Sequence, residues 1–122
     1  MDILRGEIAI FYLLVVAHLL TDFILQGSLA VKKQGFNKYM LAHAGMMTLA
    51  FFLPLISYPA GRTVLAAGAL FVLHLIVDAA RIEINRVLKL LPGTWGGSIS
   101  LGIDQIAHIS IIYLLFRIVV LG

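Results

Sequence analysis

The stretch "EIAIFYLLVVAHLLTDFILQ", residues 7–26, decides the fold class of this chain. It is almost continuously apolar and has the roughly 20 residues that a helix needs to cross the hydrocarbon core of a bilayer. Two of its few polar residues, His18 and Asp22, are one helical turn apart. Ionisable side chains are costly inside a membrane, so this pair requires an explanation.

Three similar stretches follow, at about 39–58, 62–82 and 100–121. The composition agrees with them: 61% of the residues are hydrophobic and 12% are charged, whereas a soluble domain carries about 25% charged residues. We therefore predict an all-α polytopic membrane protein whose four transmembrane helices form a compact bundle. With 122 residues, the chain is expected to form one transmembrane domain, residues 1–122.

The connections between the spans are predicted from turn residues and from amphipathic patterns. Pro59 and Gly61 in "SYPAG" indicate a tight turn, and "RIEINRVLKLLP" is predicted to continue the third helix along the interface until Pro92. The stretch "GTWGGSISLG", residues 93–102, is predicted to be a loop with Trp95 at headgroup depth. The first span is expected to be retained, because "MDILRGE" is not the basic start of a signal peptide.

Lysine and arginine predict the orientation. The chain has a formal net charge of +3, and in a membrane protein such a basic balance is first explained by topology, so no nucleic-acid partner is expected. Six basic residues fall in the first and third connections and three on the opposite side, which places the connections in the cytoplasm and both termini outside, in a bacterial inner membrane. The two groups are Lys32, Lys33, Lys38, Arg81, Arg86 and Lys89, and Arg5, Arg62 and Arg117.

Three His/Asp pairs with i, i+4 spacing lie within the predicted spans: His18 with Asp22, His74 with Asp78, and Asp104 with His108. This spacing places both side chains of a pair on one helix face. The order reverses in the fourth span, which runs in the opposite direction to the first and third. Every histidine is therefore predicted about one turn deeper than its aspartate, and the three pairs are expected to meet in the cytoplasmic half of the bundle.

Imidazole and carboxylate groups are typical ligands of divalent transition metals, so we predict a metal site, with zinc preferred to manganese or iron. Two ions, or one ion with aspartates that orient its histidines, both fit this number of ligands. A proton-handling cluster and a hydrogen-bonded network that only fixes helix packing remain alternatives. The chain has no cysteine, which excludes thiolate ligands and nucleophiles. The candidate ligands are His18, Asp22, His43, His74, Asp78, Asp104 and His108.

Three further polar residues are secondary candidates. Gln26 and Gln105 flank the pairs and are suited to holding water or a substrate oxygen, although capping at the interface is the simpler role. Arg81, one turn from Asp78, is suited to neutralising that carboxylate or to binding a phosphate.

The segments "AHLLTDFILQ", "LAHA", "LHLIVDAAR" and "IDQIAH" together resemble the small bacterial and phage-associated integral membrane proteins grouped as domain of unknown function 3307. The resemblance extends over essentially the whole chain. It implies a four-helix membrane protein whose recurring polar positions match the three pairs, His43, Gln26 and Gln105. Arg81 departs from it, because lysine is expected there at least as often.

The function we favour is metal-dependent hydrolysis of a lipid-associated ester or phosphoester, with membrane lipid as partner and a homo-oligomer as the expected assembly. Asp22, Asp78 and Asp104 are candidate ligands or general bases, and Arg81 is the candidate phosphate contact. A proton or divalent-cation transporter or channel subunit is the alternative, and a structural membrane subunit is a third hypothesis. The outer halves of the spans are almost devoid of polar residues, which argues against conduction by a monomer.

Overall fold

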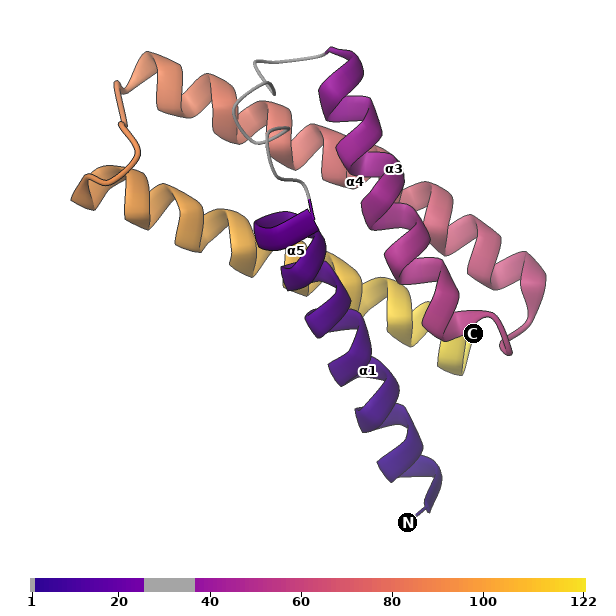
Figure 1. Ribbon diagram of the computed structural model, residues 1–122. Helices are drawn as coiled ribbons and strands as arrows, with labels where there is room; N and C mark the ends of the chain where they lie inside the picture. Colours follow the sequence, from indigo (N-terminus) through magenta and orange to yellow (C-terminus); the bar gives the residue numbers. More distant parts are fainter. Residues whose placement is uncertain (1, 26–36) are drawn as a thin grey trace.

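The computed structural model describes residues 2–25 and 37–122, and it confirms the predicted all-α class. Successive helices alternate in direction, and α4 and α5 lie side by side (Figure 1). Gln26, Lys32 and Lys33 lie outside the described residues. The elements are α1 (Asp2–Leu20) with the π-helical turn η1 (Thr21–Leu25), α3 (Lys38–Phe52) with the 3₁₀ turn η2 (Leu53–Leu55), α4 (Ala60–Val87) and α5 (Trp95–Leu121).

Within the described residues, three helical segments are long and apolar enough to cross a membrane: Arg5–Phe23, Ala60–Val87 and Trp95–Leu121. The stretch 39–58, predicted as the second span, is not among them, because α3 stops at Phe52. Pro54 lies in the 3₁₀ turn that follows and has no amide hydrogen with which to continue an α-helix. Together α3 and η2 extend for about 28 Å, close to the ~30 Å of a hydrocarbon core.

The end of α4 differs from the sequence prediction. The helix stops at Val87, before the predicted end at Pro92. Lys89 adopts a left-handed conformation with φ 53°, the Leu90 amide donates to Asn85 O at 2.9 Å, and the Lys89 amide donates to Arg86 O at 3.4 Å. These bonds form a Schellman motif, which usually has glycine at the left-handed position.

The start of α5 also differs from the prediction, because residues 95–99 are helical and not part of a loop. Thr94 is the N-cap, and its hydroxyl accepts a hydrogen bond from the Gly97 amide at 3.1 Å. A threonine in this position satisfies one of the free amides of the first turn. The glycines beside Trp95 suggested a loop, whereas the cap decides where the helix begins.

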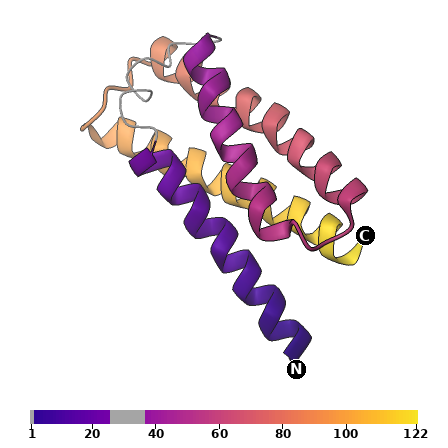
Figure 2. The same ribbon diagram turned by 45° about the vertical axis from the view of Figure 1, so that its right-hand side comes forward.

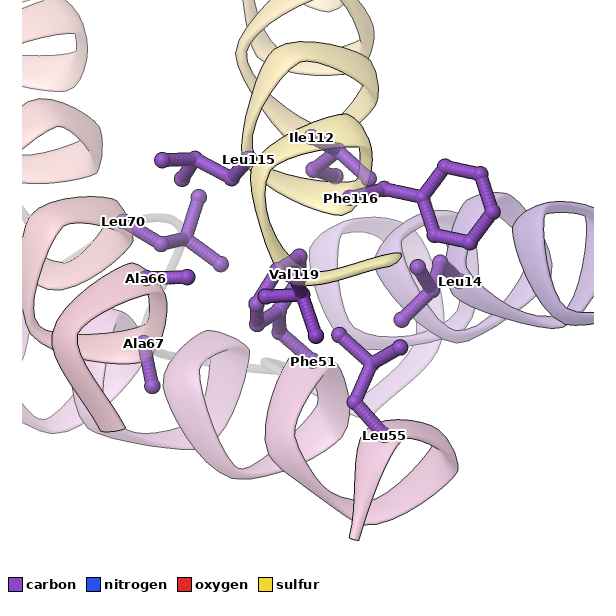
Figure 3. Close-up of a cluster of buried hydrophobic side chains, with 10 residues drawn as sticks. All are labelled: Leu14, Phe51, Leu55, Ala66, Ala67, Leu70, Ile112, Leu115, Phe116 and Val119. Carbon is purple, nitrogen blue, oxygen red and sulfur yellow. The ribbon is translucent and has the colours of Figure 1, made fainter. Parts of the chain in front are cut away.

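The apolar core contains side chains from every helix, which meet at one end of the bundle (Figure 3). The N-terminal half of α1 extends beyond the other helices in both views (Figures 1 and 2). Phe11 joins α1 to α5 through ring contacts with Phe116 at 5.7 Å and Tyr113 at 5.6 Å between centroids. The core residues are Leu14, Phe51, Leu55, Ala66, Ala67, Leu70, Ile112, Leu115, Phe116 and Val119.

Two leucines of η2 test this core. Leu55 is 0% exposed and Leu53 is 62% exposed, although they belong to the same turn. Leu55→Ala is expected to lower the free energy of unfolding by about 2–4 kcal/mol because it leaves a cavity, and Leu53→Ala by less than about 0.5 kcal/mol. Unfolding in detergent, followed by circular dichroism, measures both. Equal losses in the two variants would contradict this assignment of the core.

Candidate metal centre

The register of the helices places a polar layer directly beside the apolar core. Leu14, Leu70 and Ile112 of the core are each one turn from a histidine, on the side away from that histidine's aspartate. The resulting order along the bundle is apolar core, histidines and then aspartates. All seven candidate ligands are buried: His18, Asp22, His43, His74, Asp78, Asp104 and His108.

Asp78 is the centre of the layer and is 1% exposed. Its Oδ2 lies 3.3 Å from His74 Nε2, one turn away on α4, and 3.7 Å from His43 Nε2 on α3. Its Oδ1 lies 3.6 Å from His108 Nε2 on α5. One carboxylate therefore faces histidines from three helices.

Asp22, in the turn η1 that follows α1, contacts the same histidine cluster. Its Oδ1 lies 3.1 Å from His43 Nε2, and its Oδ2 accepts a hydrogen bond from Gln105 Nε2 at 2.5 Å. The amide oxygen of Gln105 lies 2.9 Å from His18 Nε2. Gln105 thus bridges the two members of the first pair, whereas the sequence suggested only interfacial capping or the holding of a water or substrate oxygen.

The third pair, Asp104 and His108, connects the layer to the guanidinium group of Arg81. Asp104 Oδ2 lies 3.4 Å from His108 Nδ1, and its Oδ1 lies 3.2 Å from Nε of Arg81 on α4. The spacing of one helical turn suggested Asp78 as the partner of Arg81, whereas the ion pair in the structure joins Arg81 to Asp104 of α5. Arg81 therefore lies at the edge of the layer and partly balances its negative charge.

The four imidazole rings form a continuous group. The centroid of His74 is 4.2 Å from that of His108 and 4.9 Å from that of His43, and the centroid of His18 is 5.4 Å from that of His108. Within the described residues, Nδ1 of His18, His43 and His74 has no hydrogen-bond partner although each ring is buried. The side chains of the cluster therefore do not satisfy one another's hydrogen bonds fully. Each buried polar group without a partner costs about 1–3 kcal/mol.

In the part of the chain that the structure describes, two sets of three residues have ligand atoms within 4.8 Å of one another: Asp22, His43 and His74, and His74, Asp78 and His108. Either set is able to hold a metal ion, and His74 belongs to both. The donors are imidazole nitrogens and carboxylate oxygens, which fit zinc, manganese or iron.

His18 and Asp104 lie outside these two sets but contact their members or neighbours. His18 reaches Asp22 through Gln105, and Asp104 contacts His108. Groups in such positions commonly orient the ligands of a metal and tune their basicity. The structure therefore brings all seven candidates and Arg81 together. Five candidates belong to the two ligand sets, and His18 and Asp104 lie beside these sets.

The contact made by Gln105 and the turn that carries Asp22 had no clear signal in the sequence. Asp22 lies in a π-helical turn, and the neighbouring Thr21 hydroxyl donates to Ala17 O at 2.8 Å. The π-helical turn departs from regular i, i+4 geometry, and such turns are frequent at functional sites. The one sequence feature that connected Gln105 with the cluster was its position next to Asp104.

A search of curated proteins and a search of solved structures found no match to this chain. One family profile matches residues 10–121, which include every residue of the polar layer. Its description is "protein of unknown function", and it confirms the resemblance found in the sequence segments. The chain therefore belongs to the DUF3307 family of proteins of unknown function.

Proposed function

We propose that this protein is a metal-dependent hydrolase embedded in the bacterial inner membrane by four spanning helices, and that its substrate is a lipid-associated ester or phosphoester. The observation that carries the proposal is the pair of buried three-ligand sets that share His74. In the proposed topology the end of α4 that contains Arg81 and Arg86, and the connection that contains Lys89, face the cytoplasm, and both termini face the opposite side.

The distribution of exposed side chains supports the membrane assignment. Leu65 is 76% exposed, Ile106 68% and Tyr12 66%, while His43, His74 and His108 are each 0% exposed. Water would favour the reverse arrangement, whereas lipid favours apolar side chains outside and polar groups inside the bundle. Lipid, or a second copy of the chain in a homo-oligomer, would cover the outer surface.

The cluster supports hydrolysis because it combines candidate ligands with a base and a cation. A bound zinc ion would supply a water molecule of lowered pKa and would polarise the scissile oxygen. Asp104 lies outside the two ligand sets and next to His108, so its carboxylate is not needed as a metal ligand and is the candidate proton acceptor. Arg81 is suited to hold the anionic oxygens of a phosphoester.

Transport is less well supported. A conducting path would need polar groups on both sides of the histidines, but the apolar core begins one turn from His18, His74 and His108 and includes Leu14, Leu70 and Ile112.

Asp104→Asn tests the hydrolase proposal. The variant is expected to lower kcat by about 100-fold, because the amide cannot accept the proton, while its metal content stays equal to that of the wild type. Products formed from esters and phosphoesters of membrane lipids in zinc-loaded proteoliposomes are measured by mass spectrometry. Ser110→Ala, on the exposed face of α5, is the control. The proposal fails if no lipid in the panel is hydrolysed by metal-loaded wild-type protein.

A further inference from the structure

A groove of about 460 Å³ runs along the seam between α4 and α5. Ile76, Ile84 and Leu88 of one wall and Ile103 of the other are more than half exposed, so the groove opens toward the outside of the bundle. Its volume is within the range of pockets for small molecules, about 300–1,000 Å³. From Ile76 to Leu88 it follows about 18 Å of helix, with Arg81 near the middle, so about 8–10 Å of apolar wall lies on either side of that residue.

Two charged residues line this apolar groove, Arg81 and Asp104. The Arg81 side chain is 25% exposed, and its Nε faces Asp104 Oδ1. Within the described residues, its terminal Nη atoms donate no hydrogen bond, so this edge of the guanidinium remains suited to a second anion. Two terminal N–H groups of an arginine match the oxygens of a phosphate.

Other features near Arg81 also favour an anion. Gly96, in the first turn of α5, lines the groove, and the N-terminus of a helix carries partial positive charge. A smaller hollow of about 170 Å³ shares Arg81 and Leu90 with the groove and is lined by the polar side chains of Asn85 and Ser98. Hydrocarbon-lined space, a cation and hydrogen-bonding groups therefore lie together.

We propose that the α4–α5 groove binds a phosphate-bearing lipid, with an acyl chain along the seam and the phosphate against Arg81. Charge complementarity and the apolar walls select this amphiphile over a soluble phosphate or a neutral lipid. Asp104 lines the groove and also contacts His108, so the phosphate would lie beside the metal centre. The choice of this lipid as substrate rests on the proposed hydrolase function, whereas its binding does not.

Binding is measured by native mass spectrometry of the detergent-purified protein with three probes. Dihexanoyl phosphatidic acid contains both phosphate and chains, dihexanoylglycerol lacks the phosphate, and glycerol 3-phosphate lacks the chains. We expect binding of the phosphatidic acid at least tenfold tighter than that of either fragment. Tighter or equal binding of glycerol 3-phosphate would overturn the lipid assignment in favour of a soluble phosphate.

Two variants locate the site. Arg81→Gln is expected to weaken binding by about tenfold or more, because glutamine lacks the positive charge that pairs with the phosphate. Ala107→Phe fills the groove wall without removing a polar group, and Ile106→Phe is its control, because Ile106 is 68% exposed and is not part of the groove lining. Circular dichroism shows whether each variant is folded.

The outcomes separate this inference from the proposed function. Lipid binding that survives in His74→Ala but is lost in both Arg81→Gln and Ala107→Phe supports the groove. Unchanged binding in folded Arg81→Gln and Ala107→Phe overturns it, even if hydrolysis is found. Binding in the groove without hydrolysis of any lipid ester or phosphoester by the metal-loaded protein leaves the inference standing and removes the proposed function.

Discussion

Alanine in place of His74 is expected to lower the affinity of the protein for zinc by roughly 100-fold or more. A structural zinc site contributes about 10–16 kcal/mol over its ligands, so removal of one ligand costs several kcal/mol. His74 belongs to both ligand sets, whereas His43 and His108 each belong to one. His74→Ala is therefore expected to lose more zinc affinity than His43→Ala or His108→Ala.

Zinc titration of the metal-free protein against a chromophoric chelator measures these affinities. Thr63→Val is a suitable control, because Thr63 is 1% exposed and its hydroxyl bonds back to Pro59 O at 3.1 Å, away from the histidines. Equal zinc affinity in His74→Ala and the wild type would exclude both ligand sets. Loss in the control as well would indicate general unfolding of the variants.

Gly97→Ala is expected to lower the free energy of unfolding by about 3 kcal/mol or more. A Cβ at this position would lie 2.1 Å from Leu91 O and 2.9 Å from Leu91 C, both backbone atoms that cannot rotate away. The same turn contains the Thr94 cap, whose hydroxyl donates to Leu91 O at 2.5 Å. Overpacking usually costs about 1–3 kcal/mol, and a clash with backbone belongs at the upper end or above it.

Gly102→Ala is the matched control, because nothing lies within 4 Å of its Cβ position in the same helix. There alanine should be neutral or stabilise by up to about 1 kcal/mol, as in any helix interior. Thermal unfolding in detergent, followed by circular dichroism, compares the two. A Gly97→Ala variant as stable as Gly102→Ala would contradict the close approach of the α4–α5 connection to α5.

The helical class could be predicted because apolar runs of span length have few other structural outcomes. The helix ends were less predictable. The end of α4 depends on Lys89 with φ 53°, a conformation that sequence normally signals by glycine. The start of α5 depends on a single threonine cap among glycines, and the short α3 depends on Pro54, whose effect the hydropathy pattern masked.

The membership of the polar cluster could be predicted because i, i+4 spacing and chain direction together restrict where polar side chains meet. The pairing inside the cluster could not be predicted. Arg81 pairs across helices with Asp104, and Gln105 connects His18 to Asp22. These contacts depend on the rotation of one helix against another and on the π-helical turn at Asp22, which a single-helix pattern does not contain.

We infer that the His/Asp cluster binds a transition metal. The most direct test is the metal-to-protein ratio, measured by inductively coupled plasma mass spectrometry on protein purified in detergent without chelator, beside an Asp78→Asn, His108→Ala double variant. We expect about one or two equivalents of zinc, manganese or iron in the wild type, in line with the two ligand sets, and loss of metal in the variant. Metal-free wild-type protein, even after zinc or manganese is added back, would contradict the claim.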